Sequence, residues 1–85
     1  APAREAVRAI TRERDRIVPL LRRMGYDVPD SQANFYFLKG EGGGFVEACA
    51  AAGLVVRPFP EGVRVTVGTP EQNDALLAAA GVYRT

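Results

Sequence analysis

The chain lacks histidine and tryptophan, and it has a single cysteine and a single lysine among its 85 residues. Without histidine, the Ser-His and Cys-His pairs that activate a nucleophile near neutral pH are excluded, as is a zinc site of the usual ligand set. The lone Cys49 cannot form a disulfide within the chain. We therefore expect the chain to bind no metal and to supply no catalytic residue of its own.

Long apolar runs are also absent, and none approaches the roughly 20 residues that a membrane-spanning helix needs. No basic segment followed by an apolar stretch and a cleavage site opens the chain. These absences predict a soluble, cytoplasmic protein that does not enter a membrane.

The net charge of +1 conceals an uneven distribution, because residues 1–24 carry seven arginines and only three acids. Those acids lie among the arginines, and no aromatic side chain is interleaved with them for base stacking. A nucleic-acid partner is therefore not expected, and the segment is interpreted as a solvated helix with pairs of opposite charge.

Apolar residues at helical spacing predict a long amphipathic helix over residues 3–24, with Gly25 as its C-terminal cap. Pro19 lies inside this pattern and is expected to kink the helix or to divide it near Val18. The apolar stripe consists of Val7, Ile10, Ile17, Leu21 and Met24.

Aromatic and β-branched runs predict strands over residues 34–39, 54–57 and 63–67. Residues 40–44, GEGGG, are expected to form a flexible connector, and residues 58–62 are expected to form the hairpin loop.

Two further helices are expected, the first over residues 45–52 with Gly53 as its stop signal. The second begins at Pro70, with Thr69 as its cap and Gln72 in the position of a capping box. The element order α-β-α-β-β-α then predicts one α+β domain. Its three-stranded antiparallel or mixed sheet should have the third strand in the middle and helices on one face.

Alternation along the strands sorts their side chains between the two faces of this sheet. The side chains expected beneath the helices are Val63, Val65, Val67, Val56, Phe35 and Phe37. Those expected on the open face are Asn34, Tyr36, Arg57, Arg64 and Thr66. Two arginines on one face, without a carboxylate in their strands, indicate an anion site.

Three segments carry a resemblance to a known family: ERDRIVPLLRRMGYDVPDSQANFYFL, LVVRPF and VRVTVGTPEQNDALLAA. In this order they resemble the C-terminal small domain of a fold-type I aminotransferase, a pyridoxal-phosphate-dependent enzyme, of the histidinol-phosphate and aromatic amino acid type. The resemblance covers residues 1–85. It implies amino group transfer between histidinol phosphate or an aromatic amino acid and 2-oxoglutarate, in amino acid biosynthesis.

The resemblance also implies roles for three residues. Arg64, in VRVTVG, matches the family's arginine that binds the substrate carboxylate. Arg57, in LVVRPF, matches the arginine at the side-chain end of the substrate, where the histidinol-phosphate enzymes bind a phosphate. Asn34, in SQANF, matches an asparagine that has a supporting place near the substrate. The loop at 58–62 is shorter than in histidinol-phosphate enzymes and is similar to that of actinobacterial aromatic aminotransferases.

The family's catalytic lysine lies in its large domain, whereas the only lysine here, Lys39, matches no catalytic motif. We therefore expect pyridoxal phosphate to be bound by a parent enzyme and not by this chain alone. The absence of an initiator methionine agrees with a domain cut from a longer enzyme. The expected partners are the large domain and an amino acid or 2-oxo acid substrate. The stripe of the first helix is expected to support a homodimer or self-association.

Two other interpretations stay open at this point. The chain could be a free-standing small-molecule-binding or regulatory module, because similar α+β sheets occur in sensor domains. It could also bind nucleic acid through its first helix, which strongly salt-dependent binding would reveal.

Overall fold

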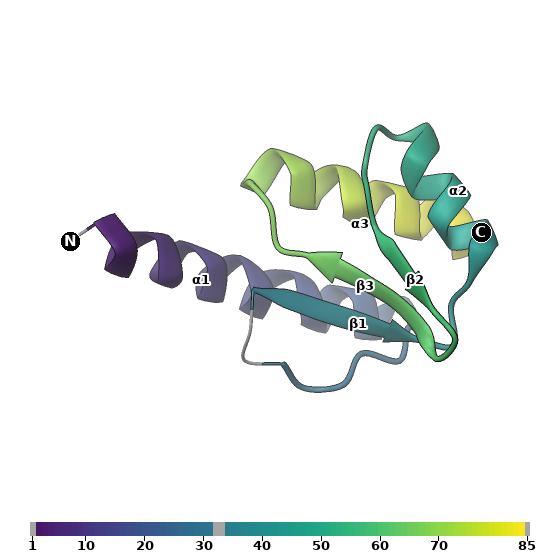
Figure 1. Ribbon diagram of the computed structural model, residues 1–85, viewed down its shortest axis with the longest axis horizontal. Coiled ribbons are helices and arrows are strands. Elements are labelled where there is room, and N and C mark those ends of the chain that lie inside the picture. The colour runs from purple at the N-terminus through teal and green to yellow at the C-terminus, as the bar shows by residue number, and fades with distance from the viewer. Residues whose placement is uncertain (1, 32–33, 85) are drawn as a thin grey trace.

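The computed structural model describes residues 2–31 and 34–84 and contains three helices and three strands among them (Figure 1). In chain order these are α1 (Pro2–Arg23), β1 (Phe35–Lys39), α2 (Gly43–Ala51), β2 (Arg57–Phe59), β3 (Gly62–Thr66) and α3 (Pro70–Arg84). The expected α+β order is confirmed. None of the described helices combines the length and the apolar character needed to cross a bilayer.

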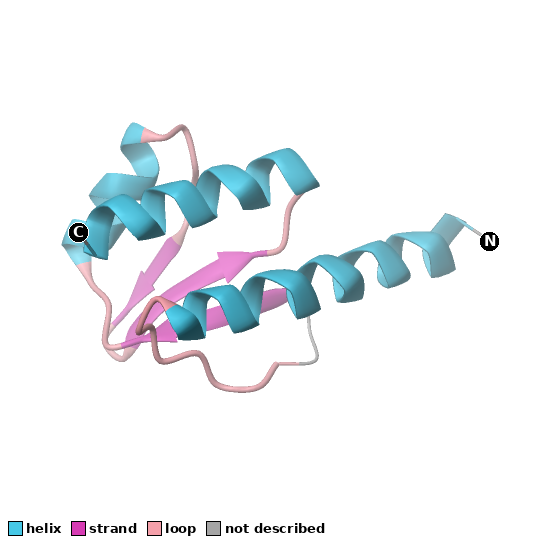
Figure 2. Ribbon diagram, turned by 180° about the vertical axis from the view of Figure 1, so that it is seen from behind, coloured by secondary structure: helices cyan, strands magenta, loops and turns pink. Residues whose placement is uncertain are grey.

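The sheet has the strand order β1-β3-β2, and β3 runs antiparallel to both neighbours. All three helices lie on the same side of this sheet, and Figure 2 shows α1 and α3 in front of it. The other side of the sheet carries no described helix. The predicted topology, with a central third strand and one open face, is therefore correct.

Helix α1 ends where the sequence predicts, because Gly25 adopts a positive φ of 98° that few other residues tolerate. The Gly25 N–H donates to the Arg22 carbonyl at 3.0 Å, and the Tyr26 N–H donates to the Leu21 carbonyl at 3.1 Å. This is the paired bonding of a Schellman cap. Pro19 lies within one continuous helix, so of the two predicted effects the division near Val18 is wrong, and the kink stays a prediction. Pro19 is exposed, and water can reach the backbone where its ring removes a hydrogen bond.

The apolar stripe of α1 is only half covered. Ile17 and Leu21 are fully buried, while Val7 is 62% exposed on the first half of α1, which projects beyond the sheet (Figure 1). Self-association through this stripe stays a prediction, and the structure leaves a shorter apolar seam for it than the sequence suggests.

Strand β2 lies three residues later than predicted. Its residues Arg57–Phe59 pair with β3, and the connecting turn is only Pro60 and Glu61. Residues 54–56 are not in a strand, and Val55 is 95% exposed. The edge position of β2 explains how Pro58 fits in a strand, because an edge residue needs no N–H on its outer side. Helix α2 also begins earlier than predicted, at Gly43, so the glycine segment is partly helical.

The predicted faces of β1 are wrong by one residue. Tyr36 and Leu38 are fully buried beneath the helices, and Phe35 and Phe37 lie on the open face. The register explains the exchange, since Tyr36 pairs with the buried Val65. The first four of the five β1 side chains are apolar or aromatic, so alternation alone gives no indication of which pair faces the core.

Candidate functional site

Arg57 and Arg64 are directly opposite each other in the β2–β3 pairing. Directly opposed residues of an antiparallel pair project from the same face, so both side chains belong to the open face. The expected convergence of the two arginines is thus present in the structure. Within the described residues, neither arginine forms an ion pair, in contrast to Arg16, Arg22 and Arg84, which meet acids at 2.7–2.9 Å.

A shallow pocket of about 250 Å³ opens beside this pair. Its lining consists of Val55, Val56, Arg57, Pro58, Arg64 and Thr66. Two guanidinium groups therefore border one small hollow, together with apolar side chains and a hydroxyl group. A guanidinium presents its N–H donors in a planar fork that matches a carboxylate or a phosphate. The pocket is thus suited to a small anion with an apolar part.

Two phenylalanine rings flank the Arg64 guanidinium and a third packs on one of them, a feature that the sequence interpretation missed. The Arg64 guanidinium carbon lies 5.1 Å from the centre of the Phe35 ring and 5.5 Å from that of Phe59. The Phe59 ring also packs on the Phe37 ring, with 6.1 Å between the centres. Phe59 was expected in a loop, and Phe35 and Phe37 were expected beneath the helices, so the sequence alone placed none of these rings beside Arg64.

Asn34, the third predicted site residue, directly precedes β1 and is exposed. Its carbonyl accepts a 2.8 Å hydrogen bond from the Val67 N–H, which extends the β1–β3 pairing by one step. Arg64 lies opposite Phe37, three residues further along β1. The structure therefore joins Asn34 to the sheet through its backbone but does not bring it into the pocket beside the arginine pair.

Asn73, which is 2% exposed, fixes the turn that follows β3. Its side-chain carbonyl accepts from the Gly68 N–H at 2.9 Å, and its amide donates to the Gly68 carbonyl at 3.0 Å. The amide also donates to the Glu13 carboxylate at 3.0 Å, which ties the turn to α1. Hydrogen bonds from Arg16 and then from Asn73 lower the pKa of Glu13. A single buried amide thus holds the end of the strand that carries Arg64.

The predicted capping box at the start of α3 is confirmed. The Gln72 N–H donates to the Thr69 hydroxyl at 3.2 Å, and the Thr69 N–H donates to the Gln72 side-chain carbonyl at 2.9 Å. This reciprocal pair satisfies two N–H groups that a helix start leaves without partners. It defines where the chain leaves β3.

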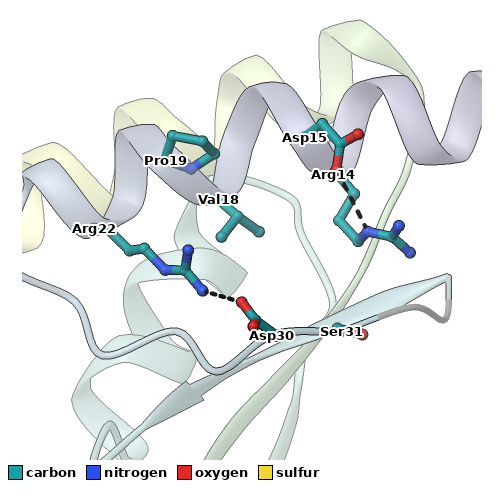
Figure 3. Close-up of a pocket in the computed structure, with 7 residues that line it drawn as sticks. All are labelled: Arg14, Asp15, Val18, Pro19, Arg22, Asp30 and Ser31. Carbon is teal, nitrogen blue, oxygen red and sulfur yellow. Dashed lines mark hydrogen bonds and ion pairs between the residues drawn. The ribbon is translucent and has the colours of Figure 1, made fainter.

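A second hollow, of about 450 Å³, lies between α1 and the loop before β1 (Figure 3). Arg22 donates to the Asp30 carboxylate at 2.9 Å and to the Val28 carbonyl at 2.6 Å. Arg14 lies 4.0 Å from the Asp15 carboxylate. Because both arginines have acids beside them here, we interpret this hollow as the seam that joins the loop to α1.

Residues 2–31 and 34–84, as the structure describes them, do not form a site that fits pyridoxal phosphate. Lys39, the only lysine, is exposed at the end of β1, where its backbone N–H donates to the Asp27 carbonyl at 2.9 Å. A covalent site for this cofactor needs a lysine beside an acid for the pyridine nitrogen and donors for a phosphate. No such set surrounds Lys39 in the described residues. Nor do those residues hold a cluster of three or more possible metal ligands.

Comparison with known proteins gives one consistent family. The family model described as "Aminotransferase class I and II" matches residues 3–79. The aromatic amino acid aminotransferase of Streptomyces avermitilis is 51% identical over 81 residues, which cover 92% of this chain and 23% of that enzyme. Its counterpart from Thermobifida fusca is 45% identical over 82 residues, with 93% and 23% covered.

Two further similarities extend the comparison to a second substrate class and to a solved structure. Histidinol-phosphate aminotransferase 2 of Bacillus cereus is 59% identical over 49 residues, which cover 56% of this chain and 13% of that enzyme. A crystal structure from Burkholderia pseudomallei, of a protein assigned as an aminotransferase, matches with a TM-score of 0.86 and 30% identity. That match covers 99% of this chain and 28% of the other. The chain therefore spans less than a third of the length of each of these proteins.

Proposed function

Because the chain belongs to the family of class I and II aminotransferases, we propose that it is the C-terminal small domain of a longer transaminase. In this proposal residues 1–85 bind the substrate, and a large domain supplies the pyridoxal phosphate and the catalytic lysine. The chain alone is then inactive. The enzyme would work in amino acid biosynthesis in the cytoplasm.

The observation that carries this proposal is the Arg57–Arg64 pair on an otherwise uncovered sheet face. Two cations side by side, without an acid of their own in the described residues, favour an anionic ligand. An amino acid or 2-oxo acid provides a carboxylate for one of them. Arg64 takes the α-carboxylate that every substrate shares, and Arg57 faces the end of the substrate that varies. Asn34 supports the substrate from the edge of the sheet when the large domain closes over it.

We favour an aromatic amino acid over histidinol phosphate as the substrate. The aromatic aminotransferases match this chain over nearly its whole length, whereas the histidinol-phosphate enzyme matches 56% of it. The two-residue turn after Phe59 leaves a short hairpin beside Arg57.

The large domain is the partner that this arrangement requires. The sheet face with Phe35, Phe59 and the two arginines is not covered by any described helix. Burial beneath a second domain removes the arginine pair from water, which strengthens a hydrogen-bonded pair with a carboxylate. Dimerisation through α1 is a further part of the proposal.

The test uses the full-length protein that contains this chain, loaded with pyridoxal phosphate. Transfer to 2-oxoglutarate is measured from tyrosine, phenylalanine and histidinol phosphate, and the highest kcat/KM is expected with an aromatic donor. The 85-residue chain, incubated with the cofactor and then borohydride, should carry no cofactor on Lys39. Activity of the isolated chain, or a full-length protein that binds these substrates without transferring the amino group, would contradict the proposal and favour a binding module.

A further inference from the structure

Arg64 is held between aromatic rings from the two outer strands. Phe35 comes from β1 and Phe59 from β2, and the guanidinium carbon of Arg64 on the central strand lies 5.1 Å and 5.5 Å from their ring centres. The Phe59 ring is supported in turn by the Phe37 ring at 6.1 Å. The three strands of the sheet thus each contribute to the environment of one guanidinium group.

Arg64 differs from the other ring-contacting arginine in having no acid beside it, because Arg84, whose guanidinium carbon lies 4.2 Å from the centre of the Tyr26 ring, also pairs with Glu41. Arg22 and Arg84 are oriented by acids at 2.9 Å and 2.8 Å, and those acids use some of their N–H donors. A ring attracts the positive charge through its π electrons and does not need a conventional hydrogen bond. The Arg64 side chain forms no hydrogen bond or ion pair with the described residues, so its planar fork stays available for a ligand.

We propose that Phe35 and Phe59 are positioning residues that hold the Arg64 guanidinium ready for the substrate carboxylate. This inference depends on the proposed carboxylate-binding role of Arg64. An arginine side chain has several rotatable bonds, and ordering it on binding reduces the affinity. The two rings order it before the substrate arrives, and they do so without an acid that would compete with the substrate.

The positioning role predicts how the loss of a ring affects different substrates. The α-carboxylate is common to amino donors and 2-oxo acids. Loss of either ring should therefore weaken the binding of every substrate by a similar factor. A ring that instead recognises the substrate's side chain would matter for aromatic substrates and leave glutamate and 2-oxoglutarate unaffected. Phe59 distinguishes the two roles most clearly, because its side chain is 39% exposed and a substrate can reach it.

The first experiment measures the KM and kcat of the full-length enzyme for tyrosine, glutamate and 2-oxoglutarate. Phe35→Leu and Phe59→Leu should each raise KM about threefold to tenfold for all three substrates, with kcat changed by less than about twofold. Phe59→Tyr keeps a ring and should stay close to the unaltered enzyme. Phe37→Leu should raise KM less than Phe59→Leu does, because Phe37 packs on the Phe59 ring but has no cation–π contact with Arg64 in the described residues.

Arg64→Lys separates this inference from the proposed function. If Arg64→Lys leaves KM unchanged, the proposed role of Arg64 is wrong. If Arg64→Lys raises KM while Phe35→Leu and Phe59→Leu do not, only the positioning role is wrong. If Phe35→Leu and Phe59→Leu raise KM for tyrosine alone, the positioning role is also wrong, and the rings instead form a subsite for the substrate's side chain. With Arg64→Lys in place, Phe59→Leu should have less effect than it has alone, because the ring then has no guanidinium to orient.

The second experiment needs only the 85-residue chain and no activity. NMR relaxation of the Arg64 Nε–Hε group should show a more restricted side chain than that of Arg57, for which the structure gives no ring contact. Phe59→Leu should lower the Arg64 order parameter while the backbone amide spectrum shows that the fold persists. An Arg64 order parameter that equals that of Arg57 and does not change in Phe59→Leu would refute the positioning role.

Discussion

Arg57 of β2 and Arg64 of β3 are paired directly across the hairpin, and within the described residues neither has an acidic partner. Like charges in this arrangement repel each other and destabilise a sheet. The Phe35 and Phe59 rings attract the charge of Arg64 and so offset part of this repulsion. An anionic ligand would neutralise the remaining repulsion, which is why we interpret the pair as a binding feature.

Arg64→Lys in the full-length enzyme is expected to raise KM and to lower kcat/KM for all substrates. A lysine keeps the charge but cannot make the two parallel hydrogen bonds by which a guanidinium holds a carboxylate. Removing the charge entirely with Arg64→Ala should cost about 2–5 kcal/mol of transition-state stabilisation, as calculated from the ratio of kcat/KM values, and the lysine variant should be intermediate. Steady-state kinetics of both variants check this order, and an alanine variant equal to the lysine variant would contradict it.

Arg57→Ala is expected to change substrate preference and to leave the binding of the α-carboxylate, which all substrates share, unaffected. Its side chain faces the variable end of the substrate in our proposal, so the ratio of kcat/KM between a phosphorylated or acidic donor and an aromatic donor should fall. The ratio, measured beside that of Arg64→Ala, is the test. If the two variants change this ratio equally, the division of roles between Arg57 and Arg64 is wrong.

The parts of the fold that depend on local chemistry were predictable from the sequence. The caps at Gly25 and Gly53 and the Thr69–Gln72 capping box depend on residues within one turn of each helix, and all are present. The arginine pair was predictable too, because a hairpin keeps Arg57 and Arg64 close in sequence and in space.

The parts of the fold that depend on strand register were not predictable from the sequence. β1 reads FYFLK, with apolar or aromatic residues at its first four positions, so its orientation is decided by pairing with Val63 and Val65 on a strand 25 residues or more away. The sequence interpretation ended the second strand at Arg57 because proline is uncommon inside strands, whereas β2 runs through Pro58 to Phe59. As a result the sequence located the two arginines but not the aromatic rings around one of them.

Asn73→Ala is expected to destabilise the 85-residue chain by about 2–4 kcal/mol, because it leaves the partly buried N–H and carbonyl of Gly68 and the Glu13 carboxylate each without one hydrogen-bond partner. Thr69→Ala, which removes only an exposed cap four residues earlier, should cost about 1 kcal/mol. Urea denaturation of both variants gives the comparison. A smaller loss for Asn73→Ala than for Thr69→Ala would show that the buried amide does not organise this turn.

Tyr36→Phe is expected to raise the free energy of unfolding by about 1 kcal/mol. The Tyr36 hydroxyl is buried and has no hydrogen-bond partner in the described part of the chain, so the variant removes an unsatisfied polar group and keeps the ring. Tyr26→Phe is the matched control, because the Tyr26 hydroxyl donates to the Ala80 carbonyl at 2.7 Å. That variant should lose about 1 kcal/mol instead. Opposite signs in urea denaturation support this assignment, and a destabilised Tyr36→Phe would mean that a water molecule satisfies the hydroxyl.

The same hydroxyl should make the chain sensitive to alkali. Burial, with a smaller contribution from the neighbouring Cys49, raises the pKa of Tyr36 above its ordinary value of 10.0. Below that value Tyr36 is protonated in both the folded and the unfolded chain, and its contribution to stability is constant. As the pH rises above it, the unfolded chain loses the proton while the folded chain retains it, so stability falls with increasing pH.

Tyr36→Phe should therefore reduce the slope of unfolding free energy against pH above about 10 and leave it unchanged between pH 7 and 9. Tyr26 and Cys49, whose pKa values burial also raises, are present in both proteins and cancel in the difference. Equal slopes above pH 10 would show that Tyr36 ionises in the folded chain as readily as in the unfolded one.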